Sequence, residues 1–151
     1  RNDGGNLHYI YGVVASDLPT AGIVEYAPVG GTRPTDSSTG EVWNLVSGGR
    51  VAVNFTIAQV TLNNLQVGFN NATYTMSGTA SLLGPLFSTG GTGATATCAG
   101  NACQPIVAGN FAGFLAGPGG AGLGLDYYFN TRNGVIEGVA GYRRCAAPGA
   151  C

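Results

Sequence analysis

The chain has 151 residues with 27 glycines, and its 6 basic residues, all arginines, and 7 carboxylates give a net charge of −1. This is the length of one domain, and 9% charged residues, against roughly 25% in soluble domains, excludes coiled coils and charged disordered tails. Six arginines spread among seven carboxylates form no basic stripe that could bind nucleic acid. Glycine interrupts every apolar run before it reaches the roughly 18 residues that a membrane-spanning helix needs.

Apolar residues alternate with period two along most of the chain, which predicts strands and not helices. In the first candidate strand, 7–14, Leu7, Tyr9, Tyr11 and Val13 alternate with His8, Ile10, Gly12 and Val14, which is typical of a half-buried strand. Further strands are expected at 22–28, 51–57, 59–69 with a kink at Asn63 and Asn64, 72–80, 86–97, 104–116, 121–130 and 135–143.

Turn signals separate these candidates. Asn133 followed by Gly134 predicts a tight hairpin between the last two strands. Pro19 and Pro34 mark turns within 17–20 and 30–40, and Gly48 with Gly49 marks another. The stretch 117–122 matches a GxGxxG string, but Pro118 lies inside it and no helix follows, so a turn is expected.

Sequential strands without crossover helices favour an all-β antiparallel meander, and closing it removes exposed edges. The prediction is a single small β-barrel of about eight strands spanning 1–151; a β-sandwich or jelly roll is the alternative. Glycines within strands fit the strong curvature of a small barrel. One face of each of two strands is expected to fill the interior: Val51, Val53, Phe55 and Ile57 with Leu123, Leu125, Tyr127 and Phe129.

The cysteines form two local pairs, Cys98 with Cys103 and Cys145 with Cys151. Such pairs indicate disulfides in an oxidising compartment, and the second would tether the C-terminal tail. A zinc site is the less favoured alternative because neither pair is a CxxC. The chain begins at Arg1 and not at Met, so we expect either a processed product or an excised fragment. The cysteine pairs and the absence of lysine favour an exported protein at the cell surface or outside the cell.

Several segments resemble a known family. The stretch GNFAGFLAGPGGAGLGLDYYFN and the ending GVIEGVAGYRR, with Ile136, Gly138, Ala140, Tyr142 and Arg144, resemble the closing strands of the transferrin-binding-protein-like β-barrel. HYIYG, LPTAGIVEY, FNNATYTMSGTA and CAGNAC are similar to the barrel segment of exported proteobacterial proteins with FecR-like domains. The resemblance covers nearly the whole chain and implies a bacterial barrel whose relatives include iron-scavenging proteins.

No catalytic constellation emerges from the residues. The seven carboxylates lie mostly in expected loops, and spacing places no two of them on one inward face for acid and base work. No GxSxG elbow is present, and His8 is the single histidine available as a base. We therefore expect a protein that is not an enzyme and has neither cofactor nor metal.

The sequence allows two roles for His8. As a strand histidine it would be solvated or hydrogen-bonded on the polar side of the first strand. As an axial ligand it would hold haem iron, with Tyr9 or Tyr11 beside it for stacking or as a second ligand. Haem is thus the alternative cofactor.

Low charge removes the repulsion that keeps proteins monomeric, which favours a self-assembling structural subunit that acts through protein contacts. The expected contact is the glycine-rich start, Arg1, Asn2, Asp3, Gly4 and Gly5, pairing with another copy or with another surface protein. The alternative function is a ligand-binding barrel in iron or haem acquisition, with His8, Tyr9 and Tyr11 at its site.

Overall fold

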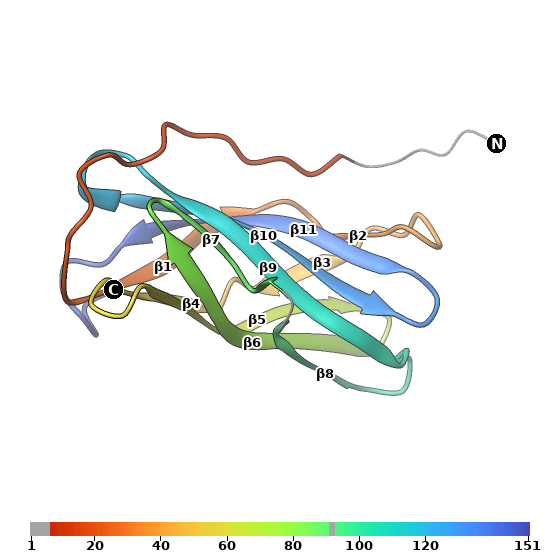
Figure 1. The fold of residues 1–151 in the computed structure, drawn as a ribbon. Helices are drawn as coiled ribbons and strands as arrows, with labels where there is room; N and C mark the ends of the chain where they lie inside the picture. The colour runs from red at the N-terminus through yellow and green to blue at the C-terminus, as the bar shows by residue number, and fades with distance from the viewer. Residues whose placement is uncertain (1–6, 91–92) are drawn as a thin grey trace.

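A computed structural model describes residues 7–90 and 93–151, and the regular secondary structure there is almost entirely antiparallel β-sheet (Figure 1). The strands follow one another closely along the chain. They are β1 (Ile23–Gly31), β2 (Thr35–Asp36), β3 (Asn44–Ser47), β4 (Arg50–Asn54), β5 (Gln59–Phe69), β6 (Ala72–Leu83), β7 (Leu86–Ser88), β8 (Thr95–Ala99), β9 (Ile106–Ala116), β10 (Gly122–Thr131) and β11 (Val135–Arg144).

Eight of these strands close into a ring, which confirms the predicted barrel over the sandwich. The pairing runs β5-β4-β1-β11-β10-β9-β7-β6, and β6 pairs again with β5. Closure joins the first long strand to the last, with Tyr26 opposite Arg144. The short strands β2, β3 and β8 lie off the ring and pair with β11, β5 and β6 respectively.

The interior is filled by side chains from the inward face of each ring strand. Val51 and Val53 are fully buried, as are the expected residues of β10, from Leu123 to Phe129 on the inward positions. Ile57 was wrongly expected in this core, because 61% of its surface is exposed. The strand ends at Asn54, whose Oδ1 accepts the Thr56 N–H, and the turn that follows carries Ile57 outward and leaves Phe55 only partly buried.

Turn chemistry was predicted well. The hairpin at Asn133 and Gly134 joins β10 to β11, and Asn64 adopts φ 58° where the register of β5 against β6 shifts. The stretch 117–122 contains a single 3-10 turn, η2 (Pro118–Gly120). The strand expected at 86–97 is wrong as one element, since Gly90 and Gly93 take positive φ and divide it into β7 and β8.

The strand expected at 7–14 is also wrong. These residues are extended but lie outside the barrel, and they join no ladder apart from an isolated bridge between Val14 and Ala116. Figure 1 shows the segment running along the outer wall over the strands near the chain's end. Since eight other strands already close the ring, no edge remains for this segment to extend.

Both predicted disulfides are formed, Cys98–Cys103 with Cα atoms 5.9 Å apart and Cys145–Cys151 with Cα atoms 4.8 Å apart. Bridging consumes the thiolates that the zinc alternative requires. The second bridge closes the tail, whose Gly149 N–H donates to Glu25 Oε2 at 2.7 Å. Within 7–90 and 93–151, no helix is long and apolar enough to cross a membrane.

Candidate functional site

Two surface features are built from chemistry-bearing side chains: the outer-wall segment 7–14 and a pocket at one mouth of the barrel. In the segment, His8 and Ile10 face the wall. His8 is held by two hydrogen bonds of 2.7 Å, one between Nδ1 and the Thr32 hydroxyl and one between Nε2 and the Thr35 hydroxyl. Thr32 Oγ1 also accepts the Val139 N–H at 3.2 Å. The single histidine therefore fastens the segment to the barrel.

A glycine in the wall, Gly124, and one in the segment, Gly12, allow the two to pack closely. A Cβ atom at Gly124 would lie 3.0 Å from Ile10 Cδ1, and one at Gly12 would lie 3.1 Å from Phe114 Cε2. The end of the segment is fixed by backbone bonds, because Ala15 N–H donates to the Leu115 carbonyl at 2.9 Å. The segment is thus anchored at both ends and packed closely along its middle.

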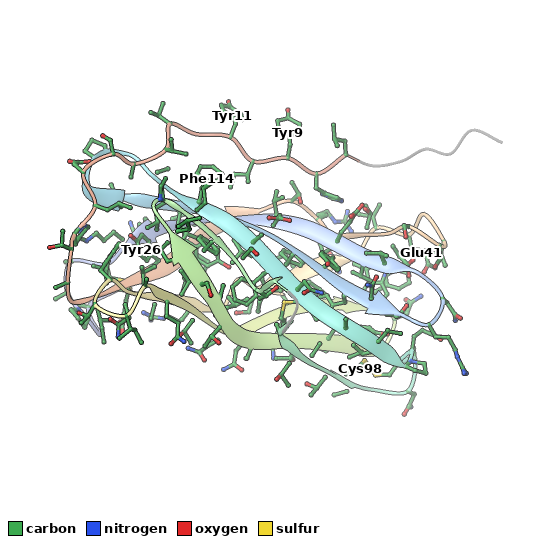
Figure 2. All side chains as sticks on the ribbon, in the orientation of Figure 1. Tyr9, Tyr11, Tyr26, Glu41, Cys98 and Phe114 are labelled. Atoms are coloured by element: carbon green, nitrogen blue, oxygen red, sulfur yellow. A yellow bond between two sulfur atoms is a disulfide. The ribbon has the colours of Figure 1, made fainter. Side chains whose placement is uncertain are left out.

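The odd-numbered residues face solvent and form what we call the tyrosine stripe: Leu7, Tyr9, Tyr11 and Val13. Their exposed fractions are 83%, 68%, 87% and 83%. The Tyr9 and Tyr11 rings stack with centroids 6.3 Å apart, and Figure 2 shows both pointing away from the barrel. The expected alternation is present, but the side that carries Tyr9 and Tyr11 faces outward, because the barrel wall holds His8 by hydrogen bonds and Ile10 by packing.

The predicted ligand-binding trio is therefore split. His8 turns toward the wall with both nitrogens hydrogen-bonded, whereas Tyr9 and Tyr11 turn toward solvent. The structure does not gather these three side chains around one point. The predicted assembly contact, from Arg1 to Gly5, lies outside the described residues.

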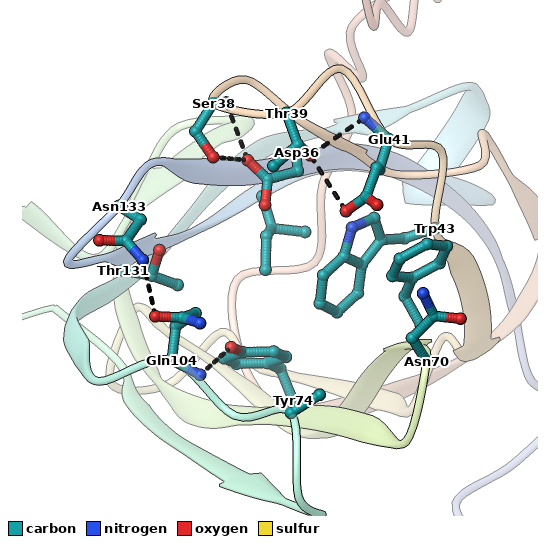
Figure 3. Close-up of a pocket in the computed structure, with 13 residues that line it drawn as sticks. Asp36, Ser38, Thr39, Glu41, Trp43, Asn70, Tyr74, Gln104, Thr131 and Asn133 are labelled. Atoms are coloured by element: carbon teal, nitrogen blue, oxygen red, sulfur yellow. Dashed lines mark hydrogen bonds between the residues drawn. The ribbon is translucent and has the colours of Figure 1, made fainter.

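The second feature is the barrel-mouth pocket, a cavity of about 220 Å³ at the end of the barrel that holds the Cys98–Cys103 loop. Its side chains converge from four connections far apart in sequence (Figure 3). The connection around β2 brings Asp36, Ser38, Thr39, Glu41 and Trp43; β5 and β6 bring Phe69, Asn70 and Tyr74; the disulfide loop brings Ala102 and Gln104; the last hairpin brings Thr131, Asn133 and Ile136.

Two carboxylates, Asp36 and Glu41, share this pocket, although their spacing in the sequence does not place them on one strand face. Asp36 Oδ1 accepts both the N–H and the hydroxyl of Ser38, at 2.8 and 2.6 Å, and Glu41 Oε2 accepts the Thr39 hydroxyl at 3.1 Å. Asp36 ends the two-residue strand β2 and Glu41 lies in the loop that follows, so neither belongs to a stretch long enough to show strand periodicity in the sequence. No arginine lines the pocket, and its rim is therefore negative.

Amides and aromatic rings complete the pocket. Asn133 Nδ2 donates to Gln104 Oε1 at 2.7 Å, and Gln104 N–H donates to the Tyr74 hydroxyl at 2.7 Å. Trp43 packs between two rings, with centroid distances of 5.2 Å to Phe69 and 5.4 Å to Tyr74. The Trp43 indole is only 5% exposed, and its Nε1–H has no hydrogen-bond partner in the described part of the chain.

No family model matches the sequence, and no curated protein does. Solved structures share the fold. The structure of intact Ap-TbpB (N and C lobes) aligns with a TM-score of 0.52 and 17% identity, over 85% of this chain and 27% of that chain. Transferrin binding protein B from Haemophilus parasuis Hp5, as a point mutant, aligns with a TM-score of 0.51 and 15% identity, over 84% and 27%.

At these identities the likeness shows the fold, and this chain spans about a quarter of the length of each structure. The expected transferrin-binding-protein-like barrel is confirmed at that level. The part of the resemblance that concerns FecR-like proteins stays a prediction.

Proposed function

We propose that this chain is a non-catalytic binding barrel of the cell surface or extracellular space, and that the tyrosine stripe binds a protein partner in iron acquisition. One observation carries the proposal: the four aliphatic and aromatic side chains of the stripe, at alternate positions of a segment that is anchored to the wall, are exposed by 68% to 87%. Contiguous exposed apolar residues of this kind mark interaction surfaces.

The stripe suits protein binding because it is ordered before a partner arrives. The anchors at His8 and Ala15 and the packing of Ile10 remove much of the conformational entropy that a free segment would lose on binding. Tyrosine is enriched at the energetic centres of interfaces, since its ring buries a large area while its hydroxyl stays hydrogen-bonded.

Two further observations support the kind of partner and the location of the protein. The fold neighbours are named for binding transferrin, so an iron-carrying protein of that kind is the first partner to test. Two disulfides fit an oxidising compartment, which supports the surface or extracellular location. The stripe would also serve contacts between copies, but the neighbours favour a different protein as the partner.

The test is surface plasmon resonance of the full chain against iron-loaded and iron-free transferrin. We expect binding, and a loss of at least tenfold in affinity for the double variant Tyr9→Ser/Tyr11→Ser with an unchanged unfolding midpoint. The matched control is Val46→Ser/Ile57→Ser, which removes two exposed apolar side chains away from the stripe and should bind normally.

Sedimentation velocity of the same variants separates the two functions. A full chain that is monomeric at high concentration and binds transferrin supports the proposal. A full chain that forms particles which the tyrosine variant dissolves, without transferrin binding, would show that the stripe joins copies of this chain.

A further inference from the structure

We propose that the barrel-mouth pocket binds one neutral polyhydroxylated molecule, the size of a single sugar ring, independently of the tyrosine stripe. The stripe lies on the outer wall over β9 to β11, whereas the pocket lies between the loops at one end of the barrel (Figures 1 and 3). The two sites therefore share no side chain, and either can be removed without the other.

The first reason is the Trp43 Nε1–H. A buried donor without a partner is costly, because it gives up its hydrogen bond to water and gains none in the protein. In Figure 3 the nitrogen-bearing edge of the indole faces the side of the pocket formed by 36–41. A ligand oxygen that reaches this edge, when the exposed Glu41 side chain turns aside, would supply the missing acceptor.

The second reason is that the rest of the pocket offers acceptors and donors together. Asp36 accepts the Ser38 N–H and hydroxyl with Oδ1, and its second carboxylate oxygen has no protein partner among the described residues. Asn133 Oδ1 is another such acceptor, because that side chain bonds Gln104 through its Nδ2, and the side-chain amides of Asn70 and Gln104 offer N–H donors. A ligand must therefore donate to the acceptors and also accept from the indole and amide N–H groups.

Of anions, ammonium cations and polyhydroxylated molecules, only the last class meets both needs. An anion can accept from the indole but is repelled by two carboxylates with no arginine in the lining. A quaternary or primary ammonium cation is attracted by the carboxylates but has no lone pair for the indole N–H. A hydroxyl both donates and accepts, so a molecule with several hydroxyls satisfies the whole set.

Size and shape agree with a single ring. The cavity of about 220 Å³ is smaller than the roughly 300–1,000 Å³ of drug-sized pockets, which excludes an oligosaccharide lying fully inside. The Trp43, Phe69 and Tyr74 rings offer apolar surface against which the C–H groups of a sugar can pack.

Trp43 is the single tryptophan of the chain, so its fluorescence reports on this pocket without labelling. The full chain is titrated with D-glucose, D-galactose, D-mannose, N-acetyl-D-glucosamine and myo-inositol, and in parallel with tetramethylammonium chloride and sodium phosphate. We expect a saturable emission change with at least one hydroxylated compound and none with the ammonium or phosphate salts. No saturable change with any hydroxylated compound, or one with tetramethylammonium alone, overturns the proposal.

Two variants test the assigned contacts by calorimetry with the compound that binds. Trp43→Phe keeps an aromatic ring but removes the N–H, and Asp36→Asn keeps the oxygen that accepts from Ser38 but removes the charge. Each should weaken binding about tenfold or more while the protein stays folded by circular dichroism. The matched control, Asp126→Asn on the outer face of β10, should bind as the wild type does.

If Trp43→Phe and Asp36→Asn both bind the compound with wild-type affinity, the compound binds elsewhere and this site is refuted. A free sugar and the end of a glycan are distinguished by comparing the monosaccharide with its methyl glycoside and with an oligosaccharide that ends in it. Equal affinity for all three indicates a glycan end, and loss of binding with the glycosides indicates a free sugar.

Discussion

The hydroxyl of Tyr127 lies beside Gly138, its partner in the β10–β11 ladder, in space that a side chain at Gly138 would occupy. A Cβ atom added at Gly138 would come within 2.5 Å of the Tyr127 Oη. Gly138 is also one of the residues on which the resemblance to transferrin-binding-protein-like barrels rests. This glycine is thus required for packing inside the barrel.

Gly138→Ala should lower the free energy of unfolding by about 1–3 kcal/mol, because the tyrosine ring must shift in a closely packed core. Chemical denaturation measures the change. Gly141→Ala is the matched control on the same strand, since its Cβ would lie 3.7 Å from its nearest neighbour, and its effect should be under about 0.5 kcal/mol. Equal effects at the two positions would contradict the packing argument.

Three buried tyrosines should respond differently to loss of the hydroxyl. Tyr26 donates to the Gly120 carbonyl at 2.7 Å and Tyr142 to the Gly48 carbonyl at 2.6 Å, whereas the Tyr127 hydroxyl has no partner among the described residues. Tyr26→Phe and Tyr142→Phe should each cost about 1 kcal/mol, and Tyr127→Phe should be neutral or stabilising. Urea titrations of the three variants give the order directly; a large loss for Tyr127→Phe would mean that its hydroxyl has a bound partner.

The same tyrosines make the protein sensitive to alkali. Burial raises the pKa of Tyr26 to about 12, against the opposing effect of the Arg144 charge, and burial also raises the pKa of Tyr127 and of Tyr142. Unfolded tyrosines lose their protons near pH 10, so the unfolded state binds fewer protons than the folded state above that pH. The free energy of unfolding should therefore hold below about pH 10 and fall as the pH rises toward 12. Denaturant midpoints across this range measure it, and a flat profile would contradict the burial of the three hydroxyls.

His8→Ala should release the outer-wall segment and leave the barrel intact. The substitution removes both bonds to the threonine hydroxyls of the wall. We expect faster hydrogen exchange at 7–14, unchanged exchange in β10 and β11, and weaker binding of the protein partner. The control is Ser16→Ala, an exposed residue just beyond the segment, which should alter none of these. Unchanged exchange in the His8 variant would show that Ile10 and the backbone bonds hold the segment by themselves.

Haem should not bind through His8. Ligation requires a free ring nitrogen, and in this structure Thr32 and Thr35 occupy both. A titration of the full chain with haemin should give no saturable shift of the Soret band. A shift that His8→Ala abolishes would restore the haem alternative.

Much of the barrel follows from local patterns in the sequence. Period-two alternation identified the long strands and the inward positions of β10, because every second side chain of a strand lies on the same face. Asn133 with Gly134 identified the hairpin, since a two-residue turn there needs residues that tolerate left-handed backbone. The short spacing of each cysteine pair identified both disulfides, because two cysteines a few residues apart can be brought together by a single turn of the chain.

The position of residues 7–14 and the composition of the barrel-mouth pocket depend on contacts between distant parts of the chain, which local sequence patterns do not specify. Residues 7–14 alternate as a strand does, but the closed ring leaves no free strand edge with which they could pair. The side that faces the barrel is set by the wall glycines against which Ile10 packs. The barrel-mouth pocket joins Asp36 and Trp43 to Asn133, roughly a hundred residues away, through loops that carry no periodic signal. Such contacts arise only when β1 pairs with β11, because ring closure brings the start and the end of the chain together.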